Sequence, residues 1–498
     1  MGQKSQLACF FTSQFIHLKR GEDLIDWARY LPAQKPKYLA IKKMVINLLE
    51  QGLLSPGEQL PAERWLAPQL AVNRSTVTRA FDELTSDGIL VRRVGSGTFV
   101  SQQVGEQQVQ HRVNWHTYLT SQPFQVGQAK RQALQHLIAQ QPADLIDVYS
   151  SDLPADLMPQ FQFPPLTWQD FNRAQEAETR LGYAPLLTAI NRLNQENQKL
   201  VLPEGQLLLT AGAQQSLFLV LQGLLVPGDA VAVESPSFFH EATLFEATGI
   251  RSFGAPLDTE GIQLAALEQL IVKHRIKLVI LNPNYQNPTG QVMSLERRQA
   301  VIRLCQTYQV PIVEDDVFGW LRFETTPALP TLKQLDPENV IYMSSLSKIM
   351  GASTRIGWVA ATPQVIDQLV RVQREMDLVP SIMSQVMATL AIQAPHFQTQ
   401  LVALRQQLQT RARQTQQVLV RALPDWQFSV AQGGFYIWGT QAVKPYALAP
   451  FIAAHVALAP GTLFGAHQAA FRINFARLNA SQLTVLAQRL QRLLNEEG

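Results

Sequence analysis

A lysine directly after an apolar run has the setting in this sequence that most favours covalent chemistry. Lys348 ends the string Ser344-Ser345-Leu346-Ser347-Lys348, and Arg355 follows seven residues later. A lysine amine can form a Schiff base with a carbonyl compound, while neighbouring hydroxyls and an arginine can hold a phosphate. Most lysines are surface charges, but this one stands among apolar and small residues. The string therefore predicts a Schiff-base lysine beside an anion site.

Three further strings come at the expected ends of apolar strands. Thr210-Ala211-Gly212-Ala213-Gln214-Gln215 predicts a strand-to-helix turn that presents backbone N–H groups to an anion. Asn282-Pro283-Asn284-Tyr285-Gln286-Asn287-Pro288-Thr289-Gly290 predicts a constrained loop where open α/β sheets bind ligands, and Asn287 can donate to a phenolate oxygen. In Glu314-Asp315-Asp316, a carboxylate can pair with a protonated ring nitrogen. Taken singly, the three strings also fit an ordinary turn, an ordinary loop and solvated acids.

Together the four strings resemble the fold type I pyridoxal-phosphate (PLP) enzymes, specifically the aminotransferase subgroup. The resemblance implies that Lys348 is the Schiff-base lysine, that Asp315 faces the pyridine nitrogen and that Asn287 faces the 3′ oxygen of the ring. The phosphate ligands implied in the same way are Ser345, Ser347, Arg355, Gly212, Ala213 and Gln214. Phe238, in Glu234-Ser235-Pro236-Ser237-Phe238, matches the aromatic that stacks on the ring, and Arg472, in Phe471-Arg472-Ile473-Asn474-Phe475, matches the arginine that grips a substrate carboxylate.

This sequence departs from the aminotransferase pattern at three places. The family usually has a tyrosine three residues after the aspartate, where this chain has Phe318, and often a tyrosine at the position of Phe238. Loss of a hydrogen bond to the phenolate should raise the Schiff-base pKa and weaken transaminase chemistry. The segment around Leu181-Gly182-Tyr183 is shorter than in the family. Tyr183 is the candidate for the tyrosine that the family sends to the phosphate of the partner subunit.

A different set of residues, near the N-terminus, suits DNA. Asn73-Arg74-Ser75-Thr76 is expected to begin the third of three helices, and a hairpin follows. In a winged helix-turn-helix the start of that helix reaches bases and phosphates, with arginine suited to guanine or phosphate. Ser75 and Thr76 can cap the helix and bond phosphate oxygens. Arg64 begins the second helix, where it is placed for a phosphate. Alone, a helix-turn-helix pattern also fits simple helix packing.

The whole ordered string resembles the GntR family of bacterial regulators. It runs from Pro56-Gly57-Glu58-Gln59-Leu60-Pro61-Ala62-Glu63-Arg64 through Val72-Asn73-Arg74-Ser75-Thr76-Val77 to Gly95-Ser96-Gly97-Thr98-Phe99-Val100. The resemblance implies that Arg64, Arg74, Thr76 and the wing Gly97 contact DNA. The two wing glycines allow a tight turn near the minor groove, although a structural role alone also explains Gly95.

These residues need an organised chain to position them. Apolar residues recur at helical spacing from Tyr38, helices follow near 62–70 and 73–86, and residues 89–100 are expected to form two strands. Strand candidates at 231–233, 278–281, 312–313 and 340–343 alternate with helical stretches, which predicts a mostly parallel sheet. The expected organisation is an arm over 1–35, a winged helix over 36–101, a linker over 102–145 and an aminotransferase-like domain over 146–498. The last domain should end in a smaller, mainly helical lobe.

Composition limits the classes of protein. The chain has 498 residues, 46% of them hydrophobic, and a net charge of +3. Residues 1–100 hold 13 Lys and Arg against 9 Asp and Glu, so the basic surplus lies with the expected DNA-binding domain. Cys9 and Cys305 are far apart, so we expect free thiols, no metal site and a cytoplasmic protein. No apolar run is long enough to predict a membrane span.

A GntR-like winged helix joined to an aminotransferase-like domain resembles the MocR group of regulators. The resemblance implies a transcription factor, dimeric through its large domain, that binds double-stranded operator DNA. It also implies a response to PLP, a vitamin B6 compound or an amino compound through Lys348, with weak or no transaminase activity. Two alternatives stay open. One is a working aminotransferase with an accessory DNA-binding domain, and the other is a repressor that keeps the fold only as a dimerisation platform.

Overall fold

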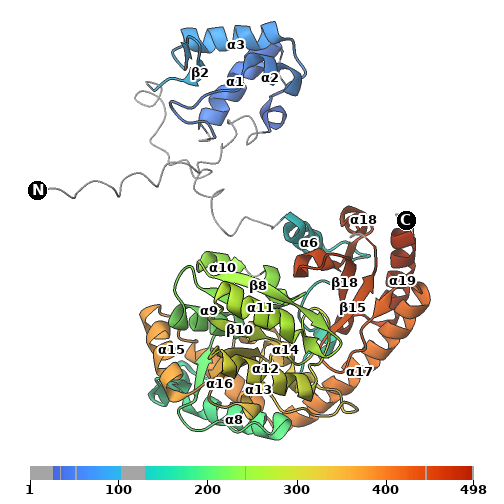
Figure 1. Cartoon of the computed structure of the whole chain (residues 1–498). Helices are drawn as coiled ribbons and strands as arrows, with labels where there is room; N and C mark the ends of the chain where they lie inside the picture. Colours follow the sequence, from blue (N-terminus) through green and yellow to red (C-terminus); the bar gives the residue numbers. More distant parts are fainter. Residues whose placement is uncertain are drawn as a thin grey trace, which may run out of the picture. The chain divides into compact units, whose positions relative to one another are not determined.

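A computed structural model describes residues 26–102 and 129–495, apart from positions 34, 51, 52, 242, 444 and 445. The chain divides into two compact units, residues 1–126 and 127–498 (Figure 1). Most of the expected arm, and the part of the linker over 103–128, lie outside the described residues.

The first unit contains the expected three helices and hairpin. They are α1 (Lys37–Glu50), α2 (Glu63–Gln69), α3 (Arg74–Ser86), β1 (Leu90–Arg93) and β2 (Gly97–Val100). The apolar stripe of α1, which includes Ile41 and Val45, is buried against Phe81 and Leu84 of α3. The hairpin pairs antiparallel from Leu90 with Val100 to Arg93 with Gly97, and this register brings the wing turn back beside α2.

The arm differs from its expected irregular form where it is described. Residues Trp27–Tyr30 form a 3-10 helix, and Trp27 is only 2% exposed because it packs into the core of the first unit. One tryptophan without a periodic neighbour gives no helical pattern to read, which is why the sequence did not indicate this contact.

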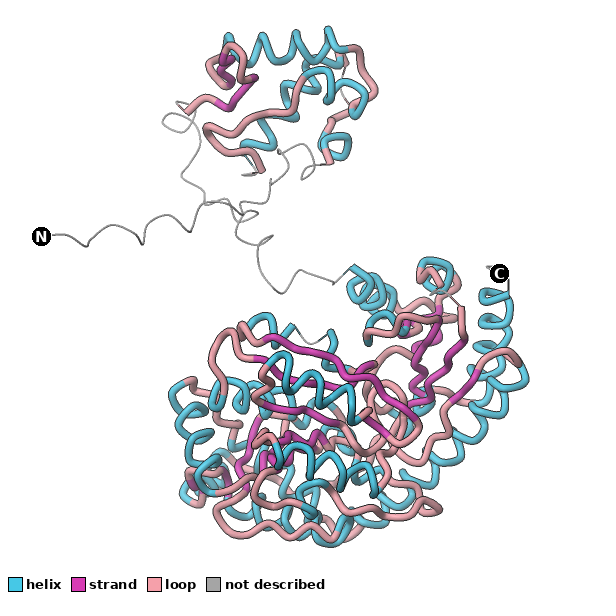
Figure 2. Tube along the Cα trace, in the orientation of Figure 1, coloured by secondary structure: helices cyan, strands magenta, loops and turns pink. Residues whose placement is uncertain are grey.

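The second unit is built on an eight-stranded sheet in the order β6-β13-β12-β11-β10-β7-β8-β9. Figure 2 shows strands of this unit in magenta with helices around them. The strands are β6 (Leu207–Thr210), β7 (Ala230–Ser235), β8 (Arg251–Asp258), β9 (Gly261–Ile262), β10 (Leu278–Leu281), β11 (Ile312–Asp315), β12 (Val340–Ser345) and β13 (Gly357–Ala360). Strands β12, β11, β10, β7 and β8 run parallel, as expected, while β13 runs antiparallel to both of its neighbours.

Helices cover both faces of this sheet because the central strands carry apolar side chains on both faces. Val231 and Val233 face one core with α9 and α15, whereas Ala230 and Ala232 face another core with α11 and α12. The helices around the sheet are α8 (Ala184–Gln198), α9 (Ala213–Leu224), α10 (Thr243–Ala247), α11 (Leu264–His274), α12 (Leu295–Thr307), α13 (Leu332–Leu335), α15 (Pro363–Glu375) and α16 (Ile382–Gln393). The parallel strands therefore deliver their carboxyl ends to one shared edge.

The C-terminal lobe contains a sheet as well as the expected helices. Strands β14 (Gln427–Phe428), β15 (Tyr436–Gln441), β18 (Ala469–Asn474) and β17 (Ala459–Pro460) pair in that order, beside α17 (Phe397–Ala422), α18 (Ala449–Ala453) and α19 (Ala480–Asn495). The short strand β3 (Ile146–Asp147) pairs with β16 (Val456–Ala457), which ties the start of the second unit to this lobe.

Part of the expected linker is folded. Residues Ala129–Gln140 form helix α6, and its Leu134 and Leu137 are buried in a cluster with Trp438 and Phe464 of the lobe. The expected linker over 102–145 is therefore wrong from residue 129 onward. Two leucines among glutamines give too weak a period to predict a docked helix. In the part of the chain that is described, no helix has both the length and the apolarity needed to cross a membrane.

Docking of α6 can be tested by removing its buried leucine. We expect Leu134→Ala to cost about 2–5 kcal/mol of local stability, because Leu134 is fully buried. Trypsin should then cut faster after Lys130 and Arg131, whereas the exposed control Gln135→Ala should leave the rate unchanged. Equal cleavage of Leu134→Ala and the wild type would contradict the docking.

Candidate functional site

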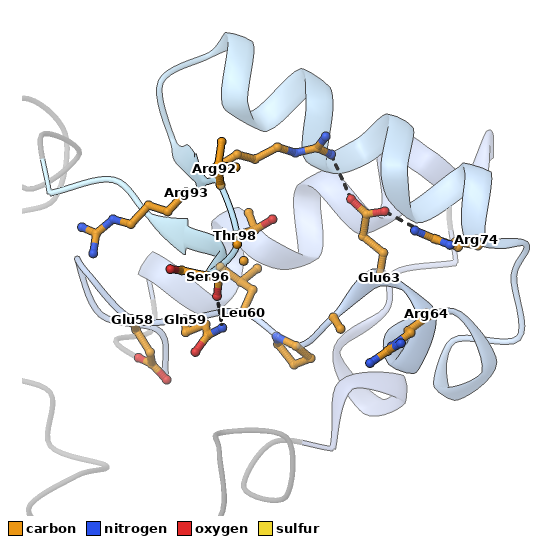
Figure 3. A pocket seen from close by; sticks show the side chains of 15 residues that line it. Glu58, Gln59, Leu60, Glu63, Arg64, Arg74, Arg92, Arg93, Ser96 and Thr98 are labelled. Atoms are coloured by element: carbon orange, nitrogen blue, oxygen red, sulfur yellow. Dashed lines mark hydrogen bonds and ion pairs between the residues drawn. The ribbon is translucent and has the colours of Figure 1, made fainter.

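The first unit holds a groove between the start of α2, the start of α3 and the hairpin (Figure 3). Its volume is about 830 Å³. Three of the residues expected to contact DNA line it, namely Arg64, Arg74 and Gly97, together with Arg92 and Arg93 of β1. The sequence reasoning did not single out these last two, although adjacent arginines before a wing turn were a visible signal.

Glu63 organises the cations of this groove. Its Oε1 lies 2.9 Å from the Arg92 guanidinium, and its Oε2 lies 3.8 Å from Nε of Arg74 (Figure 3). Oε2 also accepts the Thr78 hydroxyl at 2.7 Å. Arg92 also pairs with Asp82 at 2.8 Å. Arg92 is thus held from two sides, whereas the Arg74 side chain stays 70% exposed. An exposed guanidinium at a helix start suits a phosphate or a base edge.

The capping role expected for Ser75 and Thr76 is wrong. The cap of α3 is Asn73, and both residues lie in the first turn after it. Ser75 is exposed and Thr76 is half-buried, and neither lines the groove. Their contact with DNA remains a prediction.

Gly97 fits its place in the wing for two reasons. Its φ is +114°, and a Cβ there would stand 2.8 Å from Nε2 of Gln59. That same Nε2 donates to the carbonyl of Ser96 at 2.7 Å and so fixes the turn. Gly95 has a φ of +76° but open space around it, so only its backbone conformation favours glycine.

The second unit holds a cavity of about 670 Å³ where the strand ends meet. Its lining includes ten of the residues that the sequence assigns to a cofactor: Lys348, Asp315, Asn287, Phe238, Gly212, Ala213, Gln214, Ser345, Ser347 and Arg355. They come from the start of α9, from the ends of β11 and β12, from the segments after β7 and β10, and from helix α14 (Ser347–Met350) and the segment after it. The sheet therefore brings together four strings that are far apart in the sequence.

Asp315 provides an acceptor that awaits a donor. Its Oδ1 is buried and has no hydrogen-bond partner among the described residues. Burial raises the pKa of Asp315 to about 7, the neighbouring Asp316 adds to that rise, and the charge of Lys348 opposes it. A cationic N–H donor in the cavity would satisfy Oδ1 and favour the charged carboxylate.

The two acids beside Asp315 have other partners. Glu314 accepts the backbone N–H groups of Leu332 and Lys333, both at 2.9 Å. Asp316 accepts the Asn284 amide at 2.7 Å and the Tyr342 hydroxyl at 2.9 Å. Of the three consecutive acids, only Asp315 lines the cavity.

The expected anion ligands form one cradle. Gly212, with a φ of +102°, caps α9, and the Arg355 guanidinium lies 3.9 Å from where a Gly212 Cβ would stand. Ser345 Oγ donates to the Ile356 carbonyl at 2.9 Å and accepts the Ser347 N–H at 3.1 Å. A cation, hydroxyl groups and a helix N-terminus therefore converge, a combination that suits a phosphate.

Residues 149–152, here called the 149–152 segment, bind both reactive cations of the site. Lys348 Nζ donates to the Ser151 carbonyl at 2.6 Å and lies 5.4 Å from the centre of the Phe318 ring. Arg472, only 2% exposed, donates to the Tyr149 carbonyl at 2.6 Å and to Asn287 Oδ1 at 2.9 Å. Sequence reasoning missed this segment, since carbonyl acceptors leave no mark on residue type.

Phe238, Arg472 and Tyr183 differ in how close they come to the cavity. Phe238 lines the cavity, and its N–H donates to the Asn287 carbonyl at 2.9 Å. Arg472 reaches the cavity edge through Asn287 rather than lining the wall. Tyr183 does not line the cavity, and its N–H donates to Gln385 Oε1 at 2.7 Å. A role of Tyr183 in a partner subunit stays a prediction.

Comparisons with known proteins identify both units. Residues 157–490 match the family model described as aminotransferase class I and II, and residues 37–100 match that of bacterial regulatory proteins, gntR family. An uncharacterized HTH-type transcriptional regulator, YisV of Bacillus subtilis (strain 168), is 31% identical over 84% of this chain and 86% of that protein. The HTH-type transcriptional regulator NorG of Staphylococcus aureus (strain N315) is 24% identical over 84% of this chain and 95% of its own.

Solved structures confirm the expected fold. An archaeal alanine:glyoxylate aminotransferase superposes with a TM-score of 0.67 at 23% identity, covering 75% of this chain and 96% of that one. A multiple substrate aminotransferase from Thermococcus profundus also gives 0.67 at 23% identity, covering 77% and 99%. The second unit therefore has the fold type I architecture, and the first is a GntR winged helix. The chain belongs to the MocR-type regulators, in which a gntR-family DNA-binding domain precedes an aminotransferase class I and II domain.

Proposed function

We propose that this protein is a transcriptional regulator whose second unit binds pyridoxal phosphate and an amino compound and thereby alters DNA binding. The observation that carries the proposal is the 149–152 segment, which accepts hydrogen bonds from both Lys348 and Arg472. It follows α6, the helix at which the described part of the second unit begins. A ligand in the cavity would thus compete with a piece of the chain that comes soon after the linker in the sequence.

The donors and acceptors of the cavity fit this cofactor. The unpartnered Oδ1 of Asp315 suits the ring nitrogen, and the cradle at Gly212, Ser345 and Arg355 suits the phosphate. Phe238 would lie against the ring, and Lys348 would hold the aldehyde carbon covalently. When bound, the cofactor supplies an electron-withdrawing ring and a carbonyl carbon that reacts with amines.

The sensing step follows from competition for the same groups. Lys348 must leave the Ser151 carbonyl to bind a carbonyl compound, and it is released again when an amine replaces it. A carboxylate at Arg472 would compete with the Tyr149 carbonyl and with Asn287. The cofactor therefore favours an arrangement in which the 149–152 segment has lost the Lys348 donor, and a carboxylate favours one in which it has lost the Arg472 donor. The shift is limited to the difference in ligand affinity between the two arrangements.

The DNA-binding side of the proposal places double-stranded operator DNA across the groove of the first unit. Arg74 and Arg64 would contact bases or phosphates from the helices, with Ser75 and Thr76 bonding phosphates, and the wing turn at Gly97 would lie near the backbone. A homodimer formed through the second unit would present two such surfaces to two half-sites.

A second candidate function is a working aminotransferase. One site gathers Lys348, Asp315, Asn287 and Arg472, which favours amine chemistry. Phe318 disfavours it, since its ring stands near Lys348 Nζ in the position where the family usually has a tyrosine hydroxyl. Steady turnover of amino and keto acids at about 1 to 10³ per second would favour the enzyme. We expect turnover well below that range.

Cofactor attachment gives the first test. The purified protein incubated with pyridoxal phosphate should show a visible absorbance band, and Lys348→Ala should abolish it because no other amine occupies that position. The control Lys273→Ala, at an exposed site on α11, should keep the band. A wild-type protein without a band at any cofactor concentration would contradict cofactor binding.

DNA contact gives the second test. Arg74→Ala should weaken binding to duplex DNA from upstream of the gene, and lower the slope of log affinity against log salt by about one, because one phosphate or base contact is lost. Its visible band should be unchanged. The control Arg413→Ala removes the same charge from an exposed position on α17 and should not alter affinity. Unchanged affinity in Arg74→Ala would refute the placement of α3 on DNA.

A further inference from the structure

Glu234 is a buried acid that none of the roles above uses. It lies near the end of β7 and is only 1% exposed. Its Oε2 accepts the Asn282 N–H at 3.1 Å and the Gln286 side-chain amide at 3.3 Å. Both donors are uncharged, and both belong to the loop after β10 that carries Asn287. Burying a carboxyl group against neutral donors alone is costly, so its presence calls for a reason.

The partners of Glu234 hold three residues of the candidate cofactor site. Asn282 Oδ1 accepts the Asn287 N–H at 2.8 Å, and Asn282 Nδ2 donates to the Asp315 carbonyl at 2.6 Å. The Asn287 carbonyl in turn accepts the Phe238 N–H. Hydrogen bonds through Asn282 therefore connect the backbones of Asn287, Asp315 and Phe238. The side chains of these three residues are expected to face the ring oxygen, the ring nitrogen and the ring face. Glu234 in turn accepts the backbone N–H of Asn282.

The orientation of Gln286 shows that Glu234 Oε2 acts as an acceptor. Gln286 Oε1 accepts the Thr289 N–H at 3.0 Å, and its Nε2 donates to the Pro236 carbonyl at 2.9 Å. The amide nitrogen of Gln286 therefore faces Glu234. A glutamine at position 234 could present its own carbonyl oxygen to the same two donors, so geometry and ionisation can be separated by substitution.

The ionisation of Glu234 depends on the charge of Asp315. Burial raises the pKa of Glu234 to about 7, its two hydrogen bonds oppose the rise, and the nearby Asp315 carboxylate adds to it. Asp315, from β11, is the charged group that acts on Glu234 through space, and Lys348 acts in turn on Asp315. On the β8 side the residue paired with Glu234 is Ala255, which has no charge.

We infer that Glu234 is a positioning residue for the cofactor site and that it loses a proton when the site fills, so that cofactor affinity depends on pH. The inference rests on the proposed cofactor binding. A cationic donor paired with Asp315 cancels the negative charge that opposes ionisation of Glu234. The proton passes from the Glu234 carboxyl to solvent, and the resulting carboxylate is the stronger acceptor for Asn282 and Gln286. The loop that carries Asn287 is then held more firmly.

The test is a titration of pyridoxal phosphate into full-length wild type and Glu234→Gln at pH 6, 7 and 8, followed by the visible band. The glutamine cannot ionise, so it should match the wild type at low pH and bind more weakly than the wild type as pH rises. The ratio of the two dissociation constants should grow by about tenfold for each unit by which cofactor binding lowers the Glu234 pKa. A ratio that stays constant from pH 6 to 8 would overturn the inference.

Two variants sharpen the comparison. Glu314→Gln is the matched control, because Glu314 is also buried and its pKa is also raised to about 7, but its partners lie in α13. It should keep the wild-type pH dependence of affinity. Glu234→Asp keeps the ionisable group but withdraws it by one methylene, so it should bind more weakly than wild type at every pH. Wild-type affinity in Glu234→Asp would contradict the positioning role.

Thermal unfolding of the protein without cofactor tests the raised pKa of Glu234 independently. The pKa of Glu234 is raised from 4.5 to about 7 in the folded chain, so the unfolded chain loses this proton first. Stability should fall as pH rises between these values and level off above them. Glu234→Gln should show a shallower fall of melting temperature from pH 5 to 7.5, and an identical fall would contradict the assignment. A wild type without a visible band at any pH would instead overturn the proposed function.

Discussion

Lys348 lies in the helix that follows β12, and Arg472 lies in β18 of the C-terminal lobe, yet backbone carbonyls two residues apart, at Tyr149 and Ser151, accept hydrogen bonds from both. The 149–152 segment thereby links the end of β12 to the C-terminal lobe and lines the cavity between them. Charge-assisted hydrogen bonds are among the stronger polar contacts in a protein, and these two are partly buried. A ligand that takes either cation must therefore replace a contact of real strength.

The same constraint links the cavity to the start of the second unit. Helix α6 packs on the lobe through Leu134 and Leu137, and its residues Gln135 and Ile138 line the cavity. The chain then passes through β3 into the 149–152 segment. A ligand in the cavity would meet α6 directly and also through that segment. Both follow the DNA-binding domain in the same chain, so a change in either could affect that domain.

Much of the fold could be predicted from the sequence, because central parallel strands are apolar on both faces and leave a strong signal. Strands β7, β10, β11 and β12 were found in this way, and so were the helices and hairpin of the first unit. The ten cavity residues followed from strings at the strand ends. The apolar pattern is weaker where a segment buries only one face or only a few residues. It therefore predicts a linker over α6 and no sheet in the C-terminal lobe. The sequence does not indicate that the Ser151 carbonyl is an acceptor, or which of three adjacent acids faces the cavity. Both depend on the three-dimensional structure.

Hydrogen exchange of the full-length protein, with and without pyridoxal phosphate, tests the link between the cavity and α6 most directly. We expect faster exchange of amides within residues 129–152 when the cofactor occupies Lys348, because the contact of Lys348 with the Ser151 carbonyl is then lost. The change should be absent in Lys348→Ala. A wild-type protein that gains the visible band while exchange over 129–152 stays the same would contradict the account.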